Sequence, residues 1–164
     1  MRKTRLNRFD DAWARELVSI QMSALKVAAV ETRQQRASAY AIRRRVFIEE
    51  QGVPEELELD ADDEHAFHAV AEVDNRPVGC GRFVVHGDEI KLGRMAVLRE
   101  LRGQNIGRAI LEFLMDQARR RGFHRAALHA QLSAEGFYLK QGFRPVGNVF
   151  EEAGIDHRKM ERKL

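Results

Sequence analysis

The sequence of 164 residues is poor in cysteine and has no long hydrophobic run, and both facts limit what the protein can be. Its single cysteine, Cys80, allows no disulfide within the chain and no zinc site built on cysteines, which favours a reducing cytoplasm. No uninterrupted apolar run reaches the roughly 18 residues of a membrane span, and the charged N-terminus is not followed by an apolar segment. We therefore expect neither export nor membrane insertion.

Several ligand motifs are also missing. The ATP-binding pattern G-x-x-x-x-G-K-[ST] does not occur, and GCGRFV at 79–84 lacks the third glycine of a dinucleotide fingerprint. The acidic run ELELDADDEH at 56–65 lacks the glycine and the final glutamate of a calcium loop. His65 and His68 would point to opposite faces of a strand. The sequence therefore predicts no metal site.

Composition indicates one globular domain, with 44% hydrophobic and 32% charged residues. The net charge of +3 and the pI near 9.3 raise the possibility of a nucleic-acid partner. The arginines, however, are scattered over many predicted elements, and no basic stripe is interleaved with aromatic residues. We expect an anionic partner, and no nucleic acid.

Hydrophobic periodicity predicts a mixed α/β domain over 23–164, preceded by an extension at 1–22 that includes a short helix in 10–20. Strands are expected at 23–31, 66–74, 77–87, 88–98 and 124–132, with a final strand near the C-terminus. Helices are expected at 33–52, 107–122 and 134–142. Hairpin-linked strands pair antiparallel, and strands separated by a helix tend to be parallel. Unpaired strand edges also allow a homodimer.

The segment LRGQNIGRAIL at 101–111 places two glycines where a strand gives way to a helix. The first N–H groups of a helix have no intrahelical partner, and glycine lets an anion approach them. Residues 102–108 could therefore hold a phosphate. The alternative is that Gly103 and Gly107 serve only the turn and close packing.

This loop resembles the Q/R-x-x-G-x-G/A signature of the GNAT acetyltransferases, with Arg102 first, Asn105 in place of the middle glycine and Gly107 last. GFYLKQGF at 136–143 resembles a second family element, and RRRVFIEEQGVP, KLGRMAV and EEAGIDHRKM resemble the ElaA/YjcF-like branch. The resemblance implies a mixed, mostly antiparallel sheet with helices on both faces, splayed between two central parallel strands. It also implies an N-acetyltransferase that moves acetyl from acetyl-CoA directly to an amine.

The resemblance further implies site residues. The pantetheine arm would meet the strand positions Met95, Ala96 and Val97, and the N–H of Ala96 or Val97 would bind the developing oxyanion. Tyr138 would protonate the leaving thiolate, and Gln131 stands where many members have Asn. The pyrophosphate would lie on the loop residues Arg102, Gly103, Gln104, Asn105, Ile106, Gly107 and Arg108.

Two candidates remain for the base that takes the amine proton, Glu49 and His157, and either could act directly or through water. Glu49, Glu50, Asp60, Asp63 and Glu64 could attract a cationic amine or form a solvated loop.

Cys80 is expected to be a small buried side chain. An alternative function is a catalytically silent acyl-CoA-binding sensor of the same fold.

Overall fold

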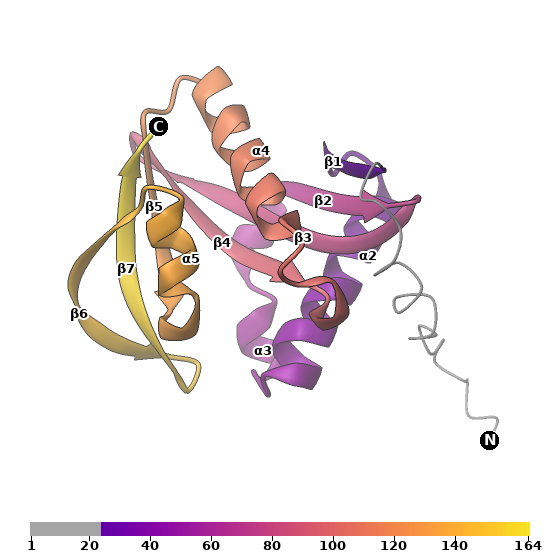
Figure 1. Ribbon diagram of the computed structural model, residues 1–164, viewed down its shortest axis with the longest axis horizontal. Helices are drawn as coiled ribbons and strands as arrows, with labels where there is room; N and C mark the ends of the chain where they lie inside the picture. The colour runs from indigo at the N-terminus through magenta and orange to yellow at the C-terminus, as the bar shows by residue number, and fades with distance from the viewer. Residues whose placement is uncertain (1–23) are drawn as a thin grey trace.

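The computed structural model describes residues 24–164 (Figure 1). The helix expected in 10–20 and the rest of the N-terminal extension lie outside the described residues. No helix in the described part of the chain is long and apolar enough to cross a membrane.

The centre of the fold is a seven-stranded sheet in the order β1-β2-β3-β4-β5-β7-β6. Within the described residues only β4 and β5 pair in parallel, and every other neighbouring pair is antiparallel. The predicted mixed sheet with two central parallel strands is confirmed. The strands are β1 Leu25–Ala29, β2 Phe67–Val73, β3 Arg76–His86, β4 Glu89–Val97, β5 Arg125–Gln131, β6 Arg144–Glu152 and β7 Ile155–Lys163.

Helices cover both faces of this sheet (Figure 1). The α-helices are α2 Arg33–Arg43, α3 Glu55–Glu58, α4 Ile106–Arg120 and α5 Glu135–Lys140. A π-helix, η1 Arg44–Glu50, continues directly from α2, and the short 3-10 turns are η2 Ala61–Glu64, η3 Arg99–Leu101 and η4 Leu132–Ala134.

Strand β3 shows how the two faces differ. A Cβ on Gly79 would come within 2.8 Å of Ile110 Cδ1, and one on Gly81 within 2.9 Å of Leu114 Cδ1, so these positions face α4. Cys80, between them, packs with Ala39 and Ile42 of α2. Side chains alternate along a strand, so the two glycines let α4 lie close to the sheet while Cys80 fills the opposite layer.

The hairpin of β2 and β3 confirms its prediction. Asp74 and Asn75 form its turn with φ of 50° and 62°. Both values lie in the left-handed region that a two-residue type I′ turn requires, and Asp and Asn tolerate this region better than most residues.

Two predicted elements differ from the structure. The helix expected at 33–52 is α-helical only to Arg43 and then continues as the π-helix η1. Similarly, the C-terminal segment forms two strands, β6 and β7, where one was expected. Ala153 and Gly154, with φ of 51° and 76°, make the turn between them.

Candidate functional site

The functional site lies where β4 and β5 separate. The two strands pair only from Ile90 to Leu92 and from Ala126 to Leu128. Beyond this point they diverge, and a cavity of about 670 Å³ opens between them. Its lining combines both strands with η1, α5 and the β6–β7 hairpin.

A β-bulge in β4 lies at the edge of this cavity. Cys80 pairs with Ala96 and Arg82 with Gly93, so Gly81 alone opposes the two residues Arg94 and Met95. Arg94 has a φ of 53°. The bulge therefore bends β4 where the two strands part.

Beyond the bulge, the N–H of Leu98 donates to the carbonyl of Val78 in β3 at 3.0 Å. Successive N–H groups alternate between the two sides of a strand, so the N–H of Val97 points toward the cavity.

The loop between β4 and α4 contributes Arg102 to the cavity lining and leads to the N-terminus of α4. Gly103 and Asn105 both adopt left-handed φ, at 79° and 63°. Asn105 is the N-cap of α4, but its side chain makes no capping hydrogen bond. The first N–H groups of this 15-residue helix therefore remain available to an anion.

The other predicted loop residues have distinct surroundings. The Ile106 side chain is buried in the core, so only its backbone can reach a ligand. A Cβ on Gly107 would lie 3.7 Å from Val97 and Phe137, an ordinary contact. Arg108 Nε donates to Glu112 at 2.8 Å on the exposed face of α4.

Arg102 lines the cavity and is held in place. Its Nη1 and Nη2 donate to the two carboxylate oxygens of Glu50 at 2.6 and 2.9 Å, and its Nε donates to the carbonyl of Val97 at 2.9 Å. The hydrogen bond from Arg102 is the main cause that lowers the pKa of Glu50. Nothing in the local sequence indicates this pair, because its members are 52 residues apart.

Tyr138 of α5 also lines the cavity. It is 8% exposed, and its ring makes edge contacts with Phe137 and Phe143. Burial raises the pKa of the Tyr138 phenol above its ordinary value, so the phenol keeps its proton at neutral pH.

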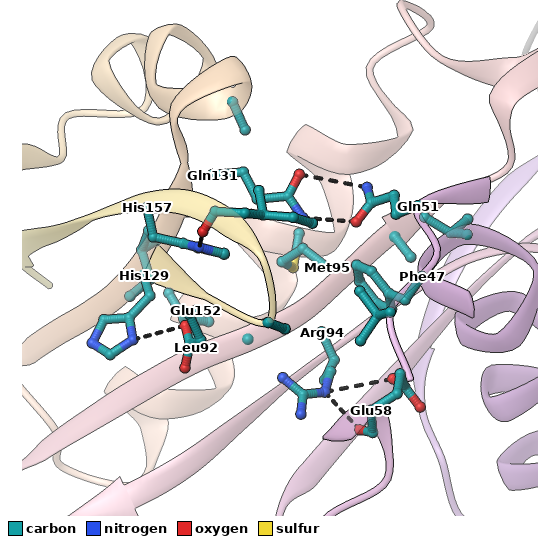
Figure 2. Close-up of a pocket in the computed structure, with 18 of the residues that line it drawn as sticks. Phe47, Gln51, Glu58, Leu92, Arg94, Met95, His129, Gln131, Glu152 and His157 are labelled. Atoms are coloured by element: carbon teal, nitrogen blue, oxygen red, sulfur yellow. Dashed lines mark hydrogen bonds and ion pairs between the residues drawn. The ribbon is translucent and has the colours of Figure 1, made fainter. Parts of the chain in front are cut away.

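The two candidate bases lie in different places. His157 of β7 lines the cavity, and its Nδ1 lies 2.7 Å from the carbonyl of Ile155 (Figure 2). A carbonyl can only accept, so Nδ1 carries a proton, and in the neutral imidazole the lone pair is therefore on Nε2. Glu49 is exposed and lines a separate, smaller hollow beside Arg45 and Arg99.

Gln131, at the end of β5, faces Gln51 across the cavity (Figure 2). Gln131 Nε2 donates to Gln51 Oε1 at 2.8 Å. Gln51 follows η1 directly, and sequence reasoning missed it because its partner is 80 residues away.

His129 and Glu152 are two further lining residues that sequence reasoning missed. His129 Nδ1 lies 3.3 Å from a carboxylate oxygen of Glu152. Burial, followed by the charge of Lys91, lowers the pKa of His129. This imidazole is therefore neutral at neutral pH.

Part of the acidic run at 56–65 is neither solvated nor free to attract an amine, because some of its carboxylates are buried in ion pairs. Arg43 of α2, 1% exposed, donates to Glu58 at 2.5 Å and to Asp63 at 2.6 Å. Arg82 of β3 binds Asp63 and also Asp60, the latter at 2.7 Å. We call Arg43, Glu58, Asp60, Asp63 and Arg82 the ion-pair cluster.

The ion-pair cluster stabilises its own charged forms. Burial alone would raise the pKa of Asp63, but the hydrogen bond from Arg43 and the nearby positive charges lower it to about 2. Arg94 joins the cluster to the bulge, since it donates to the carbonyl of Glu58 at 3.0 Å and to Asp60 at 3.1 Å. The cluster thus fixes the segment from α3 to η2, which contributes Glu58 and Asp60 to the cavity lining. Within residues 24–164, no three His, Cys, Asp or Glu side chains are grouped to hold a metal ion.

Comparison with known proteins agrees with this geometry. Residues 22–164 match the acetyltransferase (GNAT) domain family. The uncharacterized N-acetyltransferase YjcF of Bacillus subtilis (strain 168) is 34% identical over 137 residues, which is 83% of this chain and 98% of YjcF.

Among solved structures, one from Lactobacillus plantarum designated an N-acetyltransferase has a TM-score of 0.81 at 30% identity, over 87% of this chain and 99% of that one. Escherichia coli ElaA has a TM-score of 0.75 at 25% identity, over 84% of this chain and 99% of ElaA. Together with the family match, which spans all of the described residues, these likenesses show that the protein belongs to the GNAT acetyltransferase family.

Proposed function

We propose that the protein transfers the acetyl group of acetyl-CoA directly to the nitrogen of an amine acceptor. The observation that carries this proposal is the cavity between the splayed strands, with Tyr138 and His157 on its walls and with Arg102, from the loop that leads to the N-terminus of α4, in its lining. The pyrophosphate would bind the N–H groups at the start of α4, and the pantetheine arm would extend along Met95, Ala96 and Val97.

Each step of the transfer has a candidate residue. His157 Nε2 would take a proton from the acceptor ammonium, and the freed amine would attack the thioester carbonyl. The N–H of Val97 would bind the resulting oxyanion, because it points toward the cavity. As the C–S bond breaks, Tyr138 would give its proton to the thiolate, and the second proton of the acceptor nitrogen would pass through water to the tyrosinate.

The surroundings support direct transfer. Cys80, the only thiol, is 1% exposed and packs in the layer against α2, away from the cavity lining. An acyl-enzyme on Cys80 would need that layer to open. Asn105, in place of the family's middle glycine, would be the reason to expect a catalytically silent sensor. A φ of 63° is one that Asn tolerates, so this residue gives no reason to expect a broken phosphate loop.

Two substitutions test the proposal. We expect Tyr138→Phe and His157→Gln each to lower kcat by about a hundredfold, the typical contribution of a positioned acid or base. The acetylated product of an amine panel would be quantified by mass spectrometry.

Glu49→Gln is the matched control and should keep wild-type kcat, because Glu49 lies outside the cavity. Thermal unfolding with acetyl-CoA would verify that each variant still binds the cosubstrate. If wild type binds acetyl-CoA but acetylates no amine, the sensor alternative replaces the enzyme.

A further inference from the structure

The ion pair between Glu50 and Arg102 carries an inference about the loop that precedes α4. We propose that Glu50 is a positioning residue, which fixes the Arg102 guanidinium at the end of β4 and thereby sets the affinity for the diphosphate of acetyl-CoA. This rests on the proposed function, since acetyl-CoA is the ligand concerned.

Glu50 and the Val97 carbonyl together hold the Arg102 guanidinium rigidly, and we call these three hydrogen bonds the clamp. Both Glu50 oxygens accept from Arg102, at 2.6 and 2.9 Å, while the Val97 carbonyl accepts from Nε at 2.9 Å. A bidentate pair fixes the plane of a guanidinium, and the third bond fixes its rotation within that plane. Arg102 is thus oriented before any ligand arrives.

The clamp leaves part of the guanidinium available. A guanidinium has five N–H groups. Among residues 24–164, Arg102 uses three of them for Glu50 and Val97, which leaves two for a phosphate oxygen. The Arg102 side chain is 40% exposed, so a ligand can reach it. Because the pKa of Glu50 is lowered, its carboxylate is ionised at neutral pH and offsets the arginine charge. Arg102 therefore acts as an oriented donor rather than as an unpaired cation.

The same clamp joins two parts of the site. Glu50 is the last residue of η1, and this π-helix also provides Val46 and Phe47 to the cavity lining, with Gln51 directly after it. The Glu50–Arg102 pair therefore ties this cavity wall to the loop at 102–105.

Two physical roles of Glu50 predict opposite results. If Glu50 were only a negative charge near an anionic ligand, its removal would strengthen acetyl-CoA binding. If it positions Arg102, its removal frees the guanidinium to rotate and binding weakens. The sign of the change decides between them.

The test measures acetyl-CoA affinity by calorimetry for the full chain and its variants. We expect Glu50→Gln to weaken binding about tenfold, because a charge-assisted pair is lost. Glu50→Asp keeps the charge but shortens the reach, so it should also weaken binding. The matched control, Glu49→Gln, removes the same charge from the neighbouring residue and should stay within about twofold of wild type.

A double-mutant cycle shows whether Glu50 acts through Arg102. In an Arg102→Gln background, adding Glu50→Gln should cause no further loss. Unchanged or tighter binding by Glu50→Gln, wild-type binding by Glu50→Asp, or a full additional loss in the double variant would each overturn the inference. A wild-type protein that fails to bind acetyl-CoA would instead overturn the proposed function itself.

Discussion

Arg43 and Arg102 each bind carboxylates through more than one nitrogen, yet they lie in contrasting environments. The Arg43 side chain is 1% exposed within the ion-pair cluster, and the Arg102 side chain is 40% exposed at the cavity edge. Arg43 directs its Nε, Nη1 and Nη2 to carboxylate and carbonyl oxygens of the protein, whereas two N–H groups of Arg102 have no partner among residues 24–164. Burial and remaining donors, rather than residue type, therefore distinguish an ion pair that can only stabilise the fold from one that is also able to bind a ligand.

The largest effect on stability is expected from substituting Arg43, the buried arginine of this comparison. Arg43→Met would leave Glu58 and Asp63 without their main partner, and both carboxylates are almost fully buried. We expect the free energy of unfolding to fall by about 3–5 kcal/mol, as it does when one member of a buried ion pair is removed. Denaturant titration would measure this loss.

The neighbouring residue is the control for this prediction. Arg44 pairs with Glu55 on the surface, where both side chains are about half exposed. Arg44→Met should therefore cost less than about 1 kcal/mol. Equal losses of unfolding free energy in Arg43→Met and Arg44→Met would show that burial does not decide how much an ion pair of this protein stabilises it.

Acid should weaken the same cluster by a smaller amount. The pKa of Asp63 is about 2 in the folded protein against an ordinary value of 3.8. A carboxylate with a lowered folded pKa stabilises the protein above its unfolded pKa, and this contribution is lost as pH falls toward the folded pKa. We expect the free energy of unfolding to drop from about pH 4 to about pH 2.

Denaturant titrations across this pH range would measure the drop. In Asp63→Asn the free energy of unfolding should fall less steeply with decreasing pH, since the titrating group is removed. A variant with the wild-type slope would assign the acid sensitivity to other groups, among them Asp60 and Glu50, whose pKa values are also lowered.

The smallest effect on stability is expected at Asn105, in the loop that also contains Arg102, the exposed arginine. Asn105 holds φ at 63°, a region that costs a β-branched residue roughly 1–2 kcal/mol. Asn105→Val should lose about that much stability and bind acetyl-CoA several-fold more weakly, whereas Asn105→Gly should keep both.

Gly107→Ala is the control for this loop, because its Cβ would make only ordinary contacts. Thermal unfolding with and without acetyl-CoA would report both quantities. Wild-type stability and wild-type acetyl-CoA binding in Asn105→Val would mean that the loop adopts another conformation at no cost in free energy.

Local signals account for what the sequence predicted correctly. The Asp74–Asn75 turn, the amphipathic pattern of α4 and the helix before Gly142 are each encoded within a few neighbouring residues, and the structure contains all three. The mixed sheet was predicted from the order of helices and strands, its splay was implied by family resemblance, and both are confirmed. The roles of Tyr138, His157 and the phosphate loop remain proposals.

The missed features depend on tertiary contacts. The acidic run at 56–65 has the composition of a solvated loop, and only folding brings Arg43 and Arg82 beside it. Equally, no local pattern joins Glu50 to Arg102 or Gln51 to Gln131. The π-helical end of the first predicted helix was missed as well, since its apolar spacing is that of an ordinary helix.

The location of Cys80 has a practical consequence for the laboratory. Its sulfur lies between the sheet and α2, burial raises its pKa to about 12, and the sequence contains no other thiol. A colorimetric thiol reagent added to the folded protein would therefore react with released CoA and leave the protein unlabelled. Turnover could then be followed continuously, with no background signal from the enzyme.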